Sequence, residues 1–288
     1  MSRVVYLNGE FLPEAEARLP IFDRGLLFAD AVYEGLGVLD GQVVDFLAHM
    51  ARLRRSLGEL AIPEPLTQDQ IFGVLMRLVA ENRLDEGFLY FHVTRGTADR
   101  DYLYPAGLVP NIFAFTQPQG HQRADDAPQP ISMASTPDLR WARRDIKTSN
   151  LLGQVLAKTA AHKAGAGEAL MIDPEGFITE GGAVSFFIVA GGAIVARPVS
   201  NDILHGITRQ SMLAVAEARG MRVEQRKITL AEVLAADEAF VTGASSWVEP
   251  VGKVDGQAIG DGRPGPVTLA LRADYLARVR AGFYRPQA

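Results

Sequence analysis

The stretch Arg144-Asp145-Ile146-Lys147-Thr148-Ser149-Asn150-Leu151-Leu152 contains the first lysine of the chain. Of the 29 lysine and arginine residues, only five are lysines. An ammonium group can lose its proton when it is desolvated and then attack a carbonyl carbon, whereas a guanidinium group cannot. Two interpretations of Lys147 are therefore open: a surface lysine of the usual kind, or a lysine that forms a Schiff base.

Length and composition indicate a globular protein of one or two domains. With 288 residues, 48% of them hydrophobic and 22% charged, the chain can bury a large core. The net charge of -5 and the lack of a basic, aromatic-rich stripe argue against nucleic acid as a partner. The absence of cysteine excludes disulfides, thiol catalysis and cysteine-ligated metal. A polar start and the lack of an uncharged stretch of bilayer length predict a cytoplasmic protein without a membrane segment.

Turn signals and apolar spacing predict two α/β domains with mostly antiparallel sheets. We expect an N-terminal domain at 1–117, a linker rich in proline at 118–130 and a C-terminal domain at 131–288. In the N-terminal domain the pattern predicts a small hairpin around Asn8-Gly9, a second hairpin with strands at 32–39 and 42–46, and strands at 88–94 and 112–116. Helices are expected through 49–60 and, from a capping box at Thr67, up to Asn82.

The C-terminal domain is expected to combine short strands with four helices. The predicted strands lie at 131–135, 169–172, 177–179, 184–189, 193–196, 222–227 and 240–242. The predicted helices lie at 150–164, from 206 to 220, from a second capping box at Thr229-Leu-Ala-Glu232, and from Pro266 to Gly282. The larger domain should therefore carry one mostly antiparallel sheet with helices against it.

Three further features can carry chemistry beside Lys147. Thr179-Glu180-Gly181-Gly182 places a carboxylate where it could either lie in a solvated turn or hold a ring nitrogen protonated. Leu204-His205-Gly206-Ile207-Thr208-Arg209 is either an ordinary helix start or a helix start that binds phosphate. Thr242-Gly243-Ala244-Ser245-Ser246 is either a plain turn or a turn that lets an anion approach the backbone closely.

No other catalytic class assembles from the sequence. The five histidines lack the spacing of metal ligands, so no metal is expected. A nucleophile elbow, a Walker loop and a dinucleotide-binding glycine motif are all absent from the sequence. A lysine, a carboxylate for a ring nitrogen and two phosphate-binding elements together point to pyridoxal 5′-phosphate as the cofactor.

The order of motifs resembles the fold-type IV, or class IV, aminotransferases over nearly the whole chain. Within that family it is most similar to D-amino acid transaminases. The resemblance is carried by Asp23-Arg24-Gly25 with Phe28-Ala-Asp-Ala-Val-Tyr33-Glu34, by Val93-Thr-Arg95-Gly96-Thr97 with Arg100, and by Asp145-Ile-Lys147 through Lys158. It implies an α/β fold of two domains, with a smaller N-terminal domain and a C-terminal domain built on a mostly antiparallel pseudo-barrel.

The resemblance also implies a role for each matching residue. Lys147 would form the Schiff base and move the proton between the substrate and the cofactor. Glu180 would pair with the pyridine nitrogen, and Leu204 would pack on one face of the ring. The phosphate would be bound by the residues that match the family's phosphate contacts, namely Arg52, Ile207, Thr208, Ala244 and Ser245.

The substrate carboxylate has its own predicted residues. Tyr33 matches the active-site tyrosine that helps to hold this group, and Arg100 matches an arginine that reaches it from the partner subunit. A guanidinium can bind a carboxylate through two parallel hydrogen bonds, which fixes its orientation. Tyr102 stands where the D-amino acid enzymes usually have a histidine, and it can donate a hydrogen bond but carry no positive charge. The resemblance therefore implies a homodimer whose substrates are amino acids and 2-oxo acids.

Several reactions remain open on this scaffold. The leading expectation is transfer of the amino group from a D-amino acid such as D-alanine to 2-oxoglutarate in two half-reactions. The turn at Gly243-Ala244 and the stretch Tyr33-Glu34-Gly35-Leu36 look more like the branched-chain L-amino acid enzymes. Transamination of (R)-amines and the aminodeoxychorismate lyase reaction are further alternatives, as is a non-catalytic binding protein. Phe186 stands where many relatives have asparagine, and the sequence gives no reason for it.

Overall fold

The protein is described by a computed structural model that covers residues 2–118 and 123–286. The chain forms two compact units. Unit 1 comprises Met1–His121, Ile146–Asn150 and Gly282–Ala288, and unit 2 comprises Gln122–Asp145 and Leu151–Ala281. The segments 146–150 and 282–288 thus belong to unit 1, which a division into consecutive stretches does not anticipate. Residues 119–122 of the expected linker lie outside the described residues, and the linker at 118–130 stays a prediction.

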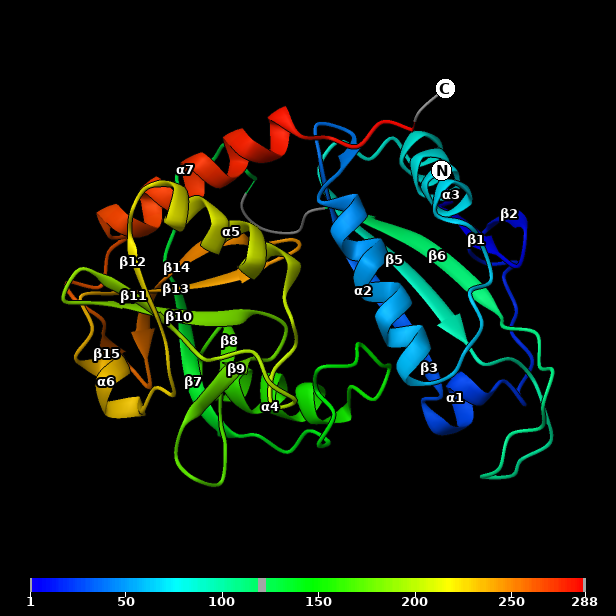
Figure 1. The fold of residues 1–288 in the computed structure, drawn as a ribbon, viewed down its shortest axis with the longest axis horizontal. Coiled ribbons are helices and arrows are strands. Elements are labelled where there is room, and N and C mark those ends of the chain that lie inside the picture. The colour runs from blue at the N-terminus through cyan, green and yellow to red at the C-terminus, as the bar shows by residue number, and fades with distance from the viewer. Residues whose placement is uncertain (1, 119–122, 287–288) are drawn as a thin grey trace. The chain divides into compact units, whose positions relative to one another are not determined.

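Unit 1 is built on an antiparallel sheet. Among the residues described, six strands pair in the order β2-β1-β6-β5-β3-β4. Their bounds are β1 (Val4–Leu7), β2 (Glu10–Pro13), β3 (Ala31–Leu39), β4 (Gln42–Val43), β5 (Gly87–Thr94) and β6 (Ile112–Pro118). The helices are α1 (Arg24–Phe28), α2 (Phe46–Glu59) and α3 (Gln68–Glu81). In Figure 1, α2 lies over β3.

The two faces of this sheet carry different side chains because strand residues alternate between faces. Leu36, Leu89 and Ala114 on one face are fully buried. Helix α2 buries Phe46, Met50 and further residues at helical spacing. These residues form an apolar stripe that packs against the core of unit 1. The opposite face carries aromatic side chains that are only partly buried.

The local predictions for unit 1 are mostly confirmed. The first hairpin and the capping box at Thr67 and Gln70 are present. The strand expected at 42–46 is wrong beyond Val43, because Phe46 begins α2. The apolar spacing Phe46, Met50, Leu53 is helical, so packing takes Phe46 into the helix. The short helix α1 was not predicted; it begins where the Asp23 carboxylate accepts the backbone N–H groups of two following residues.

Unit 2 is built on a larger, curled sheet. In the described part of the chain its strands follow the order β12-β11-β10-β13-β14-β7-β8-β9, with β15 paired to β14. Their bounds are β7 (Ile131–Pro137), β8 (Glu168–Ile172), β9 (Ile178–Gly181), β10 (Ser185–Ala190), β11 (Ala193–Ala196), β12 (Arg222–Gln225), β13 (Glu238–Gly243), β14 (Trp247–Val254) and β15 (Gln257–Ala258). Most pairs are antiparallel, and the pairs β11–β12, β14–β7 and β7–β8 are parallel. The expected mixed fold with a mostly antiparallel, barrel-like sheet is confirmed.

Four helices belong to unit 2 in the residues described. They are α4 (Leu152–Lys163), α5 (Ile207–Ala218), α6 (Leu230–Leu234) and α7 (Pro266–Ala281). All four were predicted, including the capping box that opens α6 at Thr229. Strand β14 was not predicted, although it joins β13 to β7. Its sequence contains Pro250 and Gly252, which weaken a strand signal, and its burial between two neighbours overrides that weakness.

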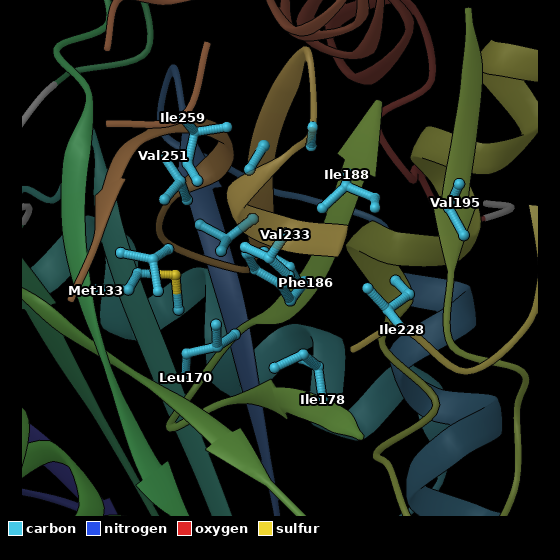
Figure 2. Packing of buried hydrophobic residues seen from close by; sticks show 14 residues of the cluster. Met133, Leu170, Ile178, Phe186, Ile188, Val195, Ile228, Val233, Val251 and Ile259 are labelled. Atoms are coloured by element: carbon cyan, nitrogen blue, oxygen red, sulfur yellow. The ribbon is translucent and has the colours of Figure 1, made fainter. Parts of the chain in front are cut away.

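The interior of unit 2 gives Phe186 a structural role. Phe186 is 4% exposed and belongs to a cluster of buried side chains from β7, β8, β9, β10, β11, β13, β14 and the region of α6. Figure 2 shows it close to Val233, among Ile178, Ile188 and Ile228. Ser185, the neighbour in the chain, must then point to the opposite face of the sheet. An aromatic residue at 186 thus serves core packing.

The described residues also contain no helix that combines the length and the apolar character needed to cross a bilayer.

Candidate active site

Lys147 is held against the edge of β3 in unit 1. The carbonyl oxygen of Lys147 accepts a hydrogen bond from the backbone N–H of Tyr33 at 3.0 Å, and Thr148 forms a bridge with Val32. The backbone N–H of Lys147 donates to the Ser56 hydroxyl of α2 at 3.3 Å. The segment 146–150 therefore pairs with β3 through an isolated bridge, and Lys147 is half-buried rather than exposed.

The amine of Lys147 lies over an aromatic ring. Its Nζ is 4.2 Å from the centroid of the Tyr33 ring. A cation in that position is attracted by the negative face of the ring. Within the part of the chain that the structure describes, no carboxylate forms an ion pair with Lys147. The structure thus brings together two residues, Lys147 and Tyr33, that the sequence placed in one site.

Arg52 belongs to a buried ion cluster. Its Nε and Nη2 donate to the two carboxylate oxygens of Glu34 at 2.9 and 2.7 Å, and His49 Nδ1 lies 2.7 Å from Glu34 Oε2. Burial alone would raise the pKa of Glu34, but the charge and hydrogen bonds of Arg52, with the hydrogen bond of His49, outweigh it and lower this pKa to about 2. Glu34 and His49 are partners of Arg52 that the sequence did not reveal. The phosphate contact expected of Arg52 stays a prediction.

Arg100 and Tyr102 lie together on an exposed loop of unit 1. The Arg100 guanidinium is 5.5 Å from the ring centroids of both Tyr102 and Phe28. Arg24 ties this loop to α1, because it donates to the carbonyl oxygen of Asp101 at 2.7 Å. Among the described residues, no carboxylate pairs with Arg100. The guanidinium is therefore available to an acidic ligand.

Glu180 lies at the end of β9 in unit 2 and is 5% exposed. Arg140 Nη1 donates to Glu180 Oε1 at 2.5 Å, and the backbone N–H of Leu204 donates to the same oxygen at 3.0 Å. Burial raises the pKa of this carboxyl more than Arg140 and Leu204 lower it. In the described residues no group donates to Oε2, which leaves that oxygen for another donor.

Arg140 is shared between two acids. Its Nε and Nη2 donate to Asp138 at 2.9 and 2.7 Å, and Asp138 also accepts the Thr179 hydroxyl at 2.7 Å. The positive charge of Arg140 is thus divided between Asp138 and Glu180. Sequence reasoning missed Arg140 and Asp138, because nothing in their spacing marks a partner 40 residues further along the chain.

The start of α5 matches the expected phosphate-binding element. Gly206 is the N-cap and provides no capping side chain, so the first N–H groups of the helix are left for another acceptor. A Cβ at Gly206 would lie 2.8 Å from the Ser185 hydroxyl oxygen, which explains why a glycine stands there. Ile207 and Thr208 form the first turn and are both 5% exposed.

The second element expected to bind an anion is the turn after β13. Thr242 ends the buried part of that strand, and Gly243, Ala244 and Ser245 are half-buried. Ser185 and Thr242 face each other in the pairing of β10 with β13. The hydroxyl oxygen of Thr242 is buried and has no hydrogen-bond partner among the described residues. Unit 2 contains all of the predicted cofactor contacts except Arg52 and Lys147. They are Glu180, Leu204, Ile207, Thr208, Ala244 and Ser245.

Comparison with known proteins identifies the family. Residues 31–254 match the model of the family described as amino-transferase class IV. The chain is 38% identical to D-alanine aminotransferase of Bacillus licheniformis, over 92% of this chain and 93% of that protein. It is 37% identical to D-alanine aminotransferase of Staphylococcus haemolyticus, over 94% and 96% of the two chains.

Solved structures share the fold. The T.th. branched-chain amino acid aminotransferase, solved with pyridoxamine 5′-phosphate, has a TM-score of 0.88 and 26% identity, over 98% of this chain and 95% of that chain. The branched-chain aminotransferase of Thermoproteus uzoniensis, solved with norvaline, has a TM-score of 0.84 and 26% identity, over 98% and 96%.

The chain belongs to the class IV aminotransferases. It is accordingly a transferase that depends on pyridoxal 5′-phosphate, as the sequence predicted.

The residues present fit this cofactor. The half-buried amine of Lys147 lies on a ring with no carboxylate paired to it among the described residues, so it suits reaction with an aldehyde. Glu180 offers a buried oxygen to a protonated ring nitrogen. The uncapped start of α5 offers N–H groups to a phosphate.

Proposed function

We propose that the protein is a D-amino acid aminotransferase that moves the amino group of D-alanine to 2-oxoglutarate in two half-reactions. The observation that carries this proposal is the 34–38% identity to D-alanine aminotransferases over 92–94% of the chain. When bound, pyridoxal phosphate supplies an aldehyde carbon and a pyridinium ring that withdraws electrons. Every other part of the task falls to side chains and backbone groups of this chain.

Lys147 is the residue that we assign to the covalent and proton-transfer chemistry. Its Nζ is the nucleophile toward an aldehyde, and once released it can carry a proton to and from the carbon atom of the substrate. The bond from the Lys147 N–H to Ser56 and the bond from the Tyr33 N–H to Lys147 fix its backbone on both sides. The face of the Tyr33 ring packs against the amine.

Glu180 holds the ring nitrogen in its protonated form in this proposal. A carboxylate beside a pyridine nitrogen favours the cation, which strengthens its pull on electrons. Arg140 and the Leu204 N–H keep Glu180 in place through one oxygen. Ile207 and Thr208 at the start of α5, the turn at Ala244 and Ser245, and Arg52 are assigned to the phosphate, and Leu204 to one face of the ring.

Arg100 is assigned to the substrate carboxylate, with Tyr33 and the hydroxyl of Tyr102 as further donors. A guanidinium orients a carboxylate through two parallel bonds. Tyr102 replaces a charged partner by a neutral one, so the attraction for the carboxylate rests on Arg100.

We also propose that the protein is a homodimer and that Arg100 serves the site of the other subunit. The loop that carries Arg100 and the neighbouring α1 region expose large apolar side chains, and a soluble monomer rarely leaves so many of them uncovered in one region. These side chains are Ile21, Phe22, Leu26, Tyr102, Leu103, Tyr104 and Val109, of which Leu103 is 81% and Val109 80% exposed. A second copy of the chain is the partner that would cover them. The cytoplasmic location likewise remains a prediction.

A branched-chain L-amino acid aminotransferase is the second candidate. It is favoured by the likeness to solved branched-chain enzymes, with TM-scores of 0.88 and 0.84 at 26% identity. The turn Gly243-Ala244-Ser245-Ser246 and the stretch Tyr33-Glu34-Gly35-Leu36 also resemble that type in sequence. The two candidates differ in the chirality of the amino acid that they accept. One experiment distinguishes them.

The decisive experiment mixes the holoenzyme separately with D-alanine, L-leucine and (R)-1-phenylethylamine and follows the absorbance of the bound cofactor. We expect D-alanine to convert the cofactor to its amino form, with formation of pyruvate. If L-leucine does so while D-alanine leaves the spectrum unchanged, the branched-chain enzyme replaces our proposal. Conversion by the amine that persists in Arg100→Ala would instead favour an amine transaminase.

The assignment of Lys147 has a direct chemical test. Borohydride reduction of the holoenzyme followed by peptide mapping should find the cofactor attached to Lys147. Lys147→Ala should lose this attachment and lower the half-reaction rate by at least about 1,000-fold. Attachment to another lysine, or an unchanged rate in the variant, contradicts the assignment.

The role of Arg100 across subunits can be tested by complementation. Lys147→Ala and Arg100→Ala homodimers should each be nearly inactive. If Arg100 acts across the interface, a mixed dimer has one intact site, so random mixing should restore about a quarter of the wild-type activity. If Arg100 acts within its own chain, no mixed dimer has an intact site and the mixture stays inactive. Light scattering gives the oligomeric state independently.

A further inference from the structure

The face of the unit 1 sheet opposite α2 carries a connected set of aromatic rings. Tyr33 of β3 stacks on Tyr90 of β5 with ring centroids 4.9 Å apart and an interplanar angle of 23°. Tyr90 stacks in turn on Phe115 of β6 at 4.9 Å. The amine of Lys147 lies on the first ring of this set, 4.2 Å from the Tyr33 centroid. The Tyr33 ring therefore packs against both Tyr90 and the Lys147 amine.

Tyr90 is fixed by a hydrogen bond as well as by stacking. Its hydroxyl oxygen lies 2.9 Å from Nδ1 of His92, two residues further along β5. His92 is 6% exposed and stacks on Phe113 at 4.5 Å, so its ring cannot turn freely. Burial lowers the pKa of His92 to about 4, against the opposing effect of the Asp23 carboxylate, and burial raises the pKa of Tyr90. Near neutral pH both groups are uncharged, with a proton on the phenol and an unprotonated nitrogen on the imidazole.

We propose that His92 is a positioning residue: its Nδ1 accepts the Tyr90 hydroxyl and so fixes the stack that holds Tyr33 beneath the Lys147 amine. The proposal rests on the function proposed above, because it gives His92 a part in the work of Lys147. His92 touches neither the amine nor Tyr33 through a hydrogen bond. It acts through Tyr90, whose ring would otherwise be held by stacking alone.

Stacking fixes the distance between two aromatic rings, but it lets one ring slide parallel to the other. Aromatic pairs have broad energy minima, whereas a hydrogen bond fixes the position of one atom. A neutral acceptor that is buried and packed on Phe113 anchors the far end of Tyr90. The Tyr90 ring then has one fixed position against which the Tyr33 ring stacks. Small displacements of a reacting group have large effects on rate, so the anchor has a kinetic consequence.

The test compares His92→Phe, which keeps an aromatic ring but has no acceptor, with His92→Gln, which restores a neutral acceptor. We expect the maximal rate of the D-alanine half-reaction to fall about 10-fold in His92→Phe and to stay within about 3-fold of wild type in His92→Gln. The apparent affinity for D-alanine should change less than the rate. His162→Phe, at an exposed histidine of α4, is the matched control and should change neither.

A double-mutant cycle isolates the hydrogen bond. Tyr90→Phe removes the donor, and the double variant Tyr90→Phe/His92→Phe should be no slower than the slower single variant, because both changes delete one interaction. Multiplying effects would show that the residues act independently and would overturn the proposal. Equal losses in His92→Gln and His92→Phe would do the same, since they would reflect packing alone.

The cofactor-free protein gives a second readout that needs no activity. Nitrogen-15 NMR of the imidazole should show His92 as the neutral tautomer with its proton on Nε2 down to about pH 5. In Tyr90→Phe this tautomer preference should weaken. A proton on Nδ1 in the wild type would contradict the acceptor role. Should L-leucine prove to be the substrate, the same variants tested with L-leucine still decide the role of His92.

Discussion

Among the described residues, Glu34 and Glu180 are buried glutamates that each pair with an arginine, and their pKa values shift in opposite directions. In unit 1, both oxygens of Glu34 are occupied, by two donors of Arg52 and by His49, and its pKa falls to about 2. In unit 2, only Oε1 of Glu180 is occupied among the described residues, by Arg140 and a backbone N–H, and its pKa is raised. Burial acts on both glutamates, so their partners make the difference.

The comparison shows how the donors around a buried acid decide whether one of its oxygens remains open to a further donor. Arg52 gives Glu34 two hydrogen bonds, whereas Arg140 gives two of its bonds to Asp138 and one to Glu180. Glu180 therefore remains incompletely neutralised and has an oxygen to spare. A second cation near that oxygen would gain stabilisation that Glu34 no longer offers. This is the property that a partner for a pyridinium requires.

Glu34→Gln should cause the largest change in stability. It leaves Arg52 and His49 buried without their anion, and breaking a buried ion pair by removing one partner typically costs about 3–5 kcal/mol, so we expect a loss of about 4 kcal/mol. Urea unfolding of the cofactor-free protein measures the free energy of unfolding. A loss below about 1 kcal/mol would mean that the cluster is not a stabilising element of unit 1.

Acid should weaken the protein through Glu34 and not through Glu180. The pKa of Glu34 is about 2 in the folded chain against an ordinary value of 4.5, so its contribution is complete above pH 4.5 and is lost as the pH falls toward 2. A difference of this size corresponds to about 3 kcal/mol.

Glu180 contributes with the opposite sign. Its folded pKa is raised from 4.5, so its contribution is present below pH 4.5 and is lost as the pH rises through the folded value. The slope of the unfolding free energy against pH should therefore become less positive in Glu34→Gln between about pH 2 and 4.5, and more positive in Glu180→Gln above pH 4.5. Changes of the same sign in both variants would contradict the comparison.

Glu180→Gln should affect the reaction more than the fold. We expect the D-alanine half-reaction to slow by about 100-fold, because a shift of about two units in the pKa of the ring nitrogen is a typical effect of one adjacent charge. Rapid mixing measures the rate, and urea unfolding should show a smaller loss of stability than in Glu34→Gln. Glu180→Asp is the matched control, since it keeps the charge.

His49→Gln should have the smallest effect. The side-chain amide of glutamine can still donate to Glu34 Oε2, so the expected loss of stability is about 1 kcal/mol or less. His49→Leu removes the donor and should cost more. If the two variants lose equally, the bond to His49 contributes little and Arg52 alone accounts for the lowered pKa of Glu34.

Local sequence signals predicted most of the helices and strands. They failed where packing against distant residues decided the secondary structure. The capping boxes at Thr67 and Thr229 act within one turn of helix, so they are readable from four residues. Phe46 was misplaced and strand β14 was missed, because each owes its state to packing against residues far away in the chain. The segment 146–150 joined unit 1 for the same reason, through bonds to β3 and α2.

The sequence alone determined the family and the cofactor, and it singled out Lys147 as the predicted Schiff-base lysine, because a covalent chemistry requires particular residue types in a particular order. Only the tertiary structure decided that Lys147 lies on the Tyr33 ring, that His92 holds Tyr90, and that Glu34 and Glu180 have different pKa values. These depend on which oxygen meets which donor, and on how far water is excluded. Around the two glutamates, these atoms are brought together across 15 to 40 residues of chain, which no local pattern records.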